Sequence, residues 1–288
     1  MAPIETAIAT TTAGEELVRH PQRKKAGKGH MSFWTWFWLI MAALYFLVPL
    51  YSTAQFSLQT SLHGYGFTWY IDTFKDPMFR SSFFFSLRLA AETVIIGLAL
   101  MVPTVYWVHL KLPQLRPVMD IISILPFVVP PVALVVGLSG AFQVMPWLLA
   151  SSHLLALLYV ILALPFTYRS LDAGMSAIKV RTLTEAAQSC GAPAWKTLLF
   201  VILPNIRTSM LSGAFLTLAI VMGEYTISSL LLFQSFAVYI YYIGNTKAQQ
   251  AAALAIVSFG LTWGAMMVLF LISRRRGGGM GQGAAVSR

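Results

Sequence analysis

The chain has few charged residues and a single cysteine. Only 10% of its 288 residues are Asp, Glu, Lys or Arg, whereas about a quarter of a soluble domain is charged, so an ordinary soluble enzyme is excluded. The lone Cys190 excludes a disulfide framework and a zinc site built from several thiolates. The 5 histidines are scattered, with no pair at ligand spacing, so no metal site is expected.

Long apolar runs take the place of the missing charge. A membrane-spanning helix needs about 20 consecutive apolar residues, and six stretches reach that length. They lie at approximately Phe33–Ser57, Ser81–Val108, Val118–Phe142, Met145–Tyr168, Thr208–Phe233 and Ala251–Ser273. We therefore predict an all-α polytopic membrane protein with six transmembrane helices. Its transmembrane domain covers residues 31–273, between a basic disordered tail at 1–30 and a flexible tail at 274–288.

The positive charge is distributed by side of the membrane. The chain has 20 Lys and Arg against 10 Asp and Glu, a net charge of +10. Most of these cations precede the first run, follow the second and fourth runs, or follow the sixth. Because Lys and Arg are retained in the cytoplasm, we predict that both termini are cytoplasmic. Cations that flank apolar runs indicate topology and lipid contact, so no nucleic-acid partner is expected.

The connection between the fourth and fifth runs is long, basic and patterned. Thr182 and Glu185 have the spacing of a capping box, which predicts a short helix beginning there, and Gly191 suits the left-handed position after its last turn. A second helix is predicted at Ala194–Leu203, with Pro204 as its end. The result is a helix–glycine–helix elbow. These residues fit docking onto a partner and packing against the chain's own spans equally well.

A motif within this elbow resembles the EAA loop of binding-protein-dependent ABC importer permeases. Its residues are, in order, Glu185-Ala186-Ala187, three others, Gly191, nine others and Val201-Ile202-Leu203-Pro204. The family pattern has the same spacing with Ile at the first of the last four positions, so Val201 is the one departure. The wider resemblance, from about Ser81 to Ser273, is to the type I importer permease core, and most of all to spermidine/putrescine-type permeases.

The resemblance implies that the loop at 169–207 couples the membrane helices to a separate ATPase. The coupling residues that it assigns are Glu185, Ala186, Ala187, Gly191, Leu203 and Pro204. It also implies a dimer of ATPase subunits that binds ATP and Mg²⁺, a second and usually different permease chain, an extracytoplasmic substrate-binding protein, and the lipid of a bacterial inner membrane. The chain itself has no phosphate-binding loop, so we expect no cofactor, no catalytic residue and no enzymatic activity.

Glu224 lies near the middle of the predicted fifth span. With Gly223 and Tyr225 it forms an element that also resembles span five of permeases for polyamines, iron and oxyanions. We expect these three residues to line the translocation path, although a buried carboxyl bonded to another span is the alternative. A carboxylate suits a cationic cargo but also occurs in oxyanion permeases, and the resemblance to spermidine/putrescine-type permeases implies a polyamine as the substrate. Iron, an oxyanion such as sulfate or molybdate, a phosphonate, and a stand-alone secondary transporter are the alternatives.

Two further patterns concern polar and proline residues inside the spans. Arg88 and Glu92 are four residues apart on one predicted helix face, so we expect them to pair with each other. Pro126, Pro130 and Pro131 interrupt the hydrogen-bond ladder of the third span. That interruption predicts a bent helix, which is either a static kink or a gate.

Overall fold

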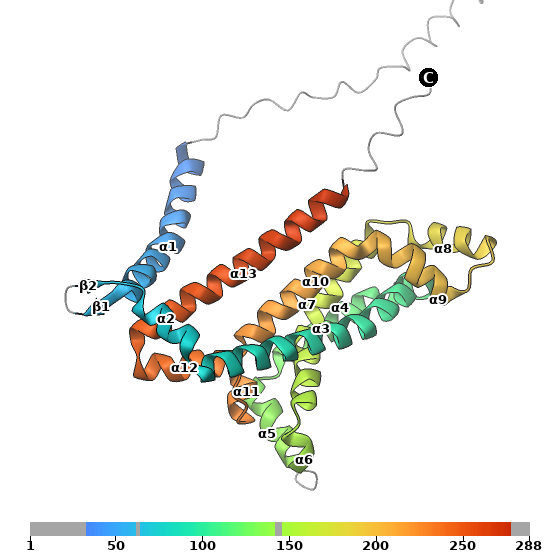
Figure 1. Ribbon diagram of the computed structural model, residues 1–288. Helices are drawn as coiled ribbons and strands as arrows, with labels where there is room; N and C mark the ends of the chain where they lie inside the picture. The colour runs from blue at the N-terminus through green and yellow to red at the C-terminus, as the bar shows by residue number, and fades with distance from the viewer. Residues whose placement is uncertain (1–32, 62–63, 142–145, 278–288) are drawn as a thin grey trace, which may run out of the picture. The chain divides into compact units, whose positions relative to one another are not determined.

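A computed structural model describes residues 33–61, 64–141 and 146–277 of the chain, almost entirely as helices (Figure 1). The chain divides after Pro49 into two units, which are described separately. The tail predicted at 1–30 lies outside the described residues, as do the last eleven residues of the tail predicted at 274–288.

The described part of the first unit is the N-terminal portion of helix α1 (Phe33–Leu58). Its side chains are apolar and exposed, among them Trp34, Trp36 and Trp38. A helix with an apolar surface on every side suits a lipid environment. The bounds of α1 confirm the first predicted apolar run as a continuous helix.

The second unit contains the end of α1 and all other elements. In chain order these are β1 (Gln59–Ser61), β2 (Gly64–Tyr65), α2 (Thr68–Lys75), α3 (Pro77–Lys111), the 3₁₀ turn η1 (Pro113–Leu115), α4 (Arg116–Val128), α5 (Pro131–Ala141), α6 (Pro146–Leu149), α7 (Ser152–Ser176), α8 (Val180–Ser189), α9 (Ala194–Thr197), the π-helical turn η2 (Leu198–Ile202), α10 (Leu203–Gly223), α11 (Thr226–Leu230), α12 (Phe236–Thr246) and α13 (Ala248–Gly277). The strands β1 and β2 form a small antiparallel hairpin.

Asp76 joins the start of α3 to α12. One carboxylate oxygen accepts the Met78 N–H at 2.8 Å and so caps the first turn of α3, where an acidic side chain is favoured. The other oxygen accepts the Tyr239 hydroxyl at 2.7 Å. Burial raises the pKa of Tyr239 above its ordinary value, and the neighbouring carboxylate acts in the same direction. The tyrosine therefore stays protonated and keeps its donor role.

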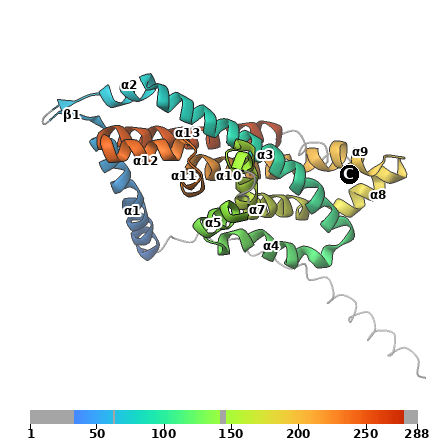
Figure 2. The same ribbon diagram turned by 90° about the horizontal axis from the view of Figure 1, so that it is seen from below.

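Helices α3, α7 and α10 pack together as the centre of the second unit (Figures 1 and 2). Helices α7 and α10 approach closely at Gly174, where an added Cβ would lie 2.4 Å from the Ser209 hydroxyl oxygen. One turn away, the Ser170 hydroxyl donates to the Ser209 carbonyl at 2.6 Å. Small residues at a crossing let membrane helices pack backbone to backbone, and here they fix α7 against α10.

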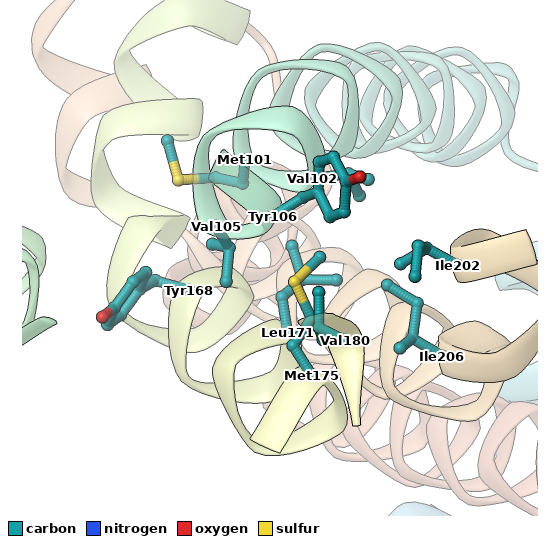
Figure 3. Close-up of a cluster of buried hydrophobic side chains, with 10 residues drawn as sticks. All are labelled: Met101, Val102, Val105, Tyr106, Tyr168, Leu171, Met175, Val180, Ile202 and Ile206. Carbon is teal, nitrogen blue, oxygen red and sulfur yellow. The ribbon is translucent and has the colours of Figure 1, made fainter. Parts of the chain in front are cut away.

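A buried apolar cluster lies where α3, α7, α8, η2 and α10 meet (Figure 3). Its residues are Met101, Val102, Val105, Tyr106, Tyr168, Leu171, Met175, Val180, Ile202 and Ile206. Val180 begins α8, and Ile202 ends η2. Both arms of the elbow are therefore anchored in the same core as the long helices.

Among the described residues, four helices are long and apolar enough to cross a membrane, and a bent helix pair raises the number to five. The four are Phe33–Leu58, Pro77–Lys111, Ser152–Ser176 and the continuous stretch Ala194–Gly223. The all-α polytopic membrane fold is thus confirmed. Helix α13 covers the sixth predicted run with 30 residues, and the count of six spans stays a prediction, as does the side on which the termini lie.

The structure corrects several predicted boundaries. The bend predicted from the prolines of the third span is confirmed, and it is a full break: α4 and α5 meet at an angle of 85° across Val129 and Pro130. Pro126 lies inside α4 without ending it. The fifth span does not run to Phe233, since α10 ends at Gly223. At the other boundaries, α7 extends into the predicted loop as far as Ser176, and α13 continues to Gly277.

Candidate functional site

The elbow consists of α8 and α9 with Gly191 between them, at the end of α3 that lies away from α12 (Figure 1). Gly191 has φ +79°, the left-handed conformation predicted for it. The Gly191 N–H donates to the Gln188 carbonyl at 2.9 Å, and the Ala192 N–H donates to the Ala187 carbonyl at 3.1 Å. These two bonds form a Schellman motif, which ends α8 and reverses the chain toward α9.

The predicted capping box is wrong, because α8 begins at Val180 rather than after Thr182. Val180 is only 5% exposed, and Thr184 is buried with its hydroxyl 3.1 Å from that of Tyr106 on α3. Burial of these two side chains fixes the first turn earlier than the local pattern indicates. Glu185 therefore lies within the helix, where its carboxylate accepts from the Arg181 guanidinium at 3.0 Å.

Pro204 does not end the second arm of the elbow, contrary to the prediction. A proline lacks an N–H and its ring crowds the carbonyl four residues earlier. The π-helical turn η2 resolves this conflict, because the Leu203 N–H bonds back five residues to Leu198. The Asn205 side chain donates to the Val201 carbonyl at 2.7 Å. The arm therefore continues into α10 as one stretch that connects the elbow directly to a membrane helix.

The six predicted coupling residues divide into an outer and an inner group. Glu185, Ala186 and Gly191 are exposed, and Ala187 is half-buried. Leu203 packs against the buried cluster of Figure 3. Pro204 is exposed at the start of α10 and shapes the turn that precedes it. The outer group is available for contact, whereas Leu203 supports the elbow from within.

A groove of about 680 Å³ separates the elbow from the end of α3. One wall is residues 109–115, from the last turn of α3 through η1. The other wall is one face of α8, formed by Arg181, Thr184, Glu185 and Gln188. We call this the elbow groove. It places a polar, partly basic surface beside the exposed Ala186 of α8.

An ionic cluster of His109, Arg116 and Asp172 lies beneath this groove and joins α3, α4 and α7. The Arg116 guanidinium binds both carboxylate oxygens of Asp172, at 3.1 and 2.9 Å, and also donates to the Ser176 hydroxyl at 2.8 Å. His109 Nε2 lies 2.8 Å from Asp172 Oδ1, and its side chain is 8% exposed. Sequence reasoning did not find this cluster, because its members are far apart in the chain and share no local pattern.

Glu224 lies in the break between α10 and α11. Its carboxylate accepts the Tyr159 hydroxyl at 2.7 Å and the backbone N–H groups of Ile227 at 2.8 Å and Ser228 at 3.3 Å. Ser228 in turn donates its hydroxyl to the Glu224 carbonyl at 3.1 Å. The arrangement matches the alternative of a carboxyl bonded to another span. Glu224 thus ends one helix, starts the next and ties both to α7.

Gly223 and Tyr225 lie on the other side of the same break. Both line an apolar groove of about 620 Å³ between α3, α10, α12 and α13, whereas Glu224 is not among its lining residues. The Tyr225 ring contacts that of Tyr241, with centroids 4.8 Å apart. Gly223 and Tyr225 thus share one groove, and the role of all three residues in a translocation path stays a prediction.

The expected pairing of Arg88 with Glu92 is also wrong. The Glu92 carboxylate instead hydrogen-bonds the ring of His153, at the start of α7, while Arg88 is exposed on α3. An i,i+4 pair on a helix surface is weak, so a partner on the adjacent helix prevails. Within the described part of the chain, no group of three His, Cys, Asp or Glu residues is placed to hold a metal ion.

Comparison with known proteins assigns the family. Residues 111–275, more than half of the chain, match the family described as binding-protein-dependent transport system inner membrane components. The chain belongs to this family. It is therefore a permease component of a binding-protein-dependent ABC importer, a membrane transport family rather than an enzyme family. The matched segment contains the ionic cluster except His109, the whole elbow, and the break at Glu224.

Two solved structures share the fold. One is a bacterial alginate ABC transporter in complex with a periplasmic protein bound to an alginate pentasaccharide, with a TM-score of 0.63, 18% identity, and coverage of 84% of this chain and 93% of that chain. The other is a bacterial ABC transporter involved in the import of the acidic polysaccharide alginate, with a TM-score of 0.61, 18% identity, and coverage of 84% and 96%. None of the curated proteins compared with the chain matches it.

Proposed function

We propose that this chain forms half of a translocation path and that a separate ATPase binds the elbow and drives transport. The single observation that carries the proposal is the elbow itself. Glu185 and Ala186 are exposed on a short helix that ends just before the exposed Gly191, while Val180 and Thr184 of the same helix are buried among α3, α7 and η2. A force applied to the outer face reaches the long helices without an intervening flexible segment.

The proposed role requires three kinds of protein partner for this chain. An ATPase dimer supplies ATP and Mg²⁺ binding, a second permease chain completes the path, and an extracytoplasmic binding protein delivers the cargo. The site residues at the ATPase contact are Glu185, Ala186, Ala187 and Gly191. The bacterial inner membrane is the location that suits such an assembly.

Glu224 does not support a polyamine as the cargo. The expectation came from the resemblance to spermidine/putrescine-type permeases, and the Glu224 carboxylate that would suit a cation already accepts three hydrogen bonds within the chain. The solved transporters of similar fold handle an acidic polysaccharide, but at 18% identity the likeness concerns the fold alone. Thermal stabilisation of the cognate binding protein tests the cargo. Stabilisation by spermidine would restore the polyamine assignment, and stabilisation by an acidic oligosaccharide would replace it.

The coupling role is tested by Ala186→Arg in the co-expressed complex. Ala186 is exposed on α8, so a long cation leaves the fold intact and blocks close approach of a partner surface. Purification through this chain should then recover much less ATPase subunit than the parent does. The matched control is Ala150→Arg, which places the same side chain at an exposed turn before α7. Equal ATPase recovery with Ala186→Arg would contradict the proposal.

A further inference from the structure

We infer that the ionic cluster of His109, Arg116 and Asp172 is the joint that transmits movement of the elbow to the broken helix pair α4 and α5. The inference rests on the proposed function and goes beyond it. It names the residues through which a conformational change of the ATPase would be passed on to α4 and α5. Each member acts as a positioning residue.

The elbow is tied to α3 and α7 by buried contacts. Thr184 of α8 bonds to Tyr106 of α3 at 3.1 Å, and both side chains are buried. Val180 packs in the same apolar cluster as Leu171 and Met175 of α7 (Figure 3). Close-packed interiors shift between discrete arrangements rather than deform continuously. A displacement of α8 is therefore passed on to the adjoining turns of α3 and α7.

Those same turns carry the ionic cluster. His109 is three residues after Tyr106, and Asp172 directly follows Leu171. Residues three apart on a helix lie on one face, so His109 follows the face that holds α8. The cluster thus begins where the elbow's buried contacts end.

Arg116 carries the connection into α4. Its guanidinium makes a two-bond fork with Asp172, at 3.1 and 2.9 Å, and its backbone carbonyl accepts the Tyr168 hydroxyl at 3.3 Å. A bidentate contact between guanidinium and carboxylate fixes orientation as well as distance. Because Arg116 is the first residue of α4, it holds the end of a helix that breaks at Val129 and bends by 85° into α5. A rotation of α4 at Arg116 would therefore displace the break at Val129.

Partial burial makes the cluster suited to this role. The Asp172 side chain is 22% exposed and that of His109 is 8% exposed, so removing the carboxylate leaves the Arg116 guanidinium and the His109 ring without the group that they share. By contrast, the Arg181–Glu185 pair on the elbow surface has side chains that are 81% and 63% exposed. Pairs this exposed contribute little. The geometry therefore assigns the mechanical link to the inner cluster.

The test uses the complex of this chain with its ATPase and second permease, in lipid nanodiscs. A Cys190→Ser, Val132→Cys parent carries one thiol on α5, just after the break, at a residue that is 51% exposed. The rate of maleimide labelling is measured without nucleotide and after trapping with ATP and vanadate. The parent should show a change of about fivefold or more, the lower end of ordinary allosteric coupling.

Asp172→Asn should abolish this nucleotide-dependent change while the complex still retains its ATPase. The swapped pair Arg116→Asp with Asp172→Arg should restore part of the change, which a general loss of stability would not allow. Arg116→Lys keeps the charge but loses the fork, so an intermediate change is expected if Asp172→Asn fails to assemble. Asp120→Asn, an exposed carboxylate on the same helix, is the matched control and should behave as the parent.

The outcomes separate the two proposals. If Asp172→Asn and Arg116→Lys keep the full nucleotide-dependent change, the joint is overturned while the coupling role stands. If the parent retains its ATPase but shows no nucleotide-dependent change, the joint is likewise overturned; if the parent retains no ATPase, the proposed function itself fails.

Discussion

Two of the predicted membrane spans are interrupted within the described residues, and the two interruptions are built from opposite chemistry. The break between α4 and α5 is made by Pro130 and Pro131, which remove donors from the helix. The break between α10 and α11 is made by Glu224, which adds an acceptor for the donors that an interruption exposes. The proline break is set within the chain's own backbone, whereas the glutamate break depends on a tertiary partner, Tyr159.

The two breaks therefore differ in what holds their conformation. A residue before proline is forced into extended backbone, and Val129 has ψ 118° accordingly. No side chain has to stay in place for that bend to persist. At the other break, the carboxylate of Glu224 must keep its bonds to Ile227, Ser228 and Tyr159, so this break is rigid only while those contacts hold. Three of the four predictions below test that contrast, and one concerns the end of α8 at Gly191.

The largest effect is expected for Glu224→Ala. The change leaves two backbone N–H groups and the hydroxyl of Tyr159, which is 1% exposed, without their acceptor. Since an unsatisfied buried group costs about 1–3 kcal/mol, we expect a loss of roughly 2–4 kcal/mol, measured as a lower midpoint of thermal unfolding in detergent. Glu224→Gln retains one acceptor oxygen and should lose less. An unchanged midpoint for Glu224→Ala would show that the carboxylate does not hold the break.

The next effect is expected at a helix end set by backbone conformation alone. Gly191→Ala introduces a Cβ that meets nothing within 4 Å, so its cost is that of the left-handed backbone, about 1–2 kcal/mol. Hydrogen exchange of the Gly191 and Ala192 amides should become faster. Asn tolerates this conformation, so Gly191→Asn is the control with slower exchange. Equal protection in both variants would contradict the account.

A smaller effect is expected for Tyr159→Phe. The substitution deletes one hydrogen bond to Glu224 but leaves the carboxylate bonded to the amides of α11. The expected loss is about 1 kcal/mol, visible as a small decrease in the unfolding midpoint. A loss as large as that of Glu224→Ala would mean that the tyrosine, rather than the cap on α11, determines the break.

The smallest change in stability is expected for the double variant Pro130→Ala, Pro131→Ala, within about 1 kcal/mol, although the geometry should change. Spin labels at Ile122→Cys and Val136→Cys, both at exposed positions, report the bend in a Cys190→Ser background. A straight helix would separate their backbones by about 21 Å, and the double variant should lengthen the distance toward that value. Pro126→Ala, within α4, should leave the distance unchanged. A retained bend in the double variant would mean that packing makes it.

Features that depend on neighbouring residues in the sequence were predicted correctly. Apolar runs gave the membrane helices because the bilayer sets their length. Gly191 was placed correctly because a left-handed helix end favours a residue without a Cβ. The motif at residues 185–204 gave the elbow and, with the family match, the permease role.

Features that depend on tertiary contacts were missed. The start of α8 follows from burial of Val180 and Thr184, which no capping pattern reveals. The continuation through Pro204 needs a π-helical turn, and the cap of Glu224 needs α11 folded beside it. The ionic cluster combines Arg116 with Asp172, 56 positions apart in the chain. Such pairs are set by the packing of α4 on α7, so the sequence alone does not show them.

The central claim is that an ATPase binds the elbow. Its most direct test uses the native cysteine. Cys190 is exposed at the last turn of α8, beside Gly191, and is the single cysteine of the chain. A short photoreactive cross-linker attached to its thiol in the assembled complex should join this chain to the co-expressed ATPase subunit. Blocking the approach with Ala186→Arg should abolish that product. A complex that retains its ATPase but gives adducts only with the second permease or with lipid would contradict the account.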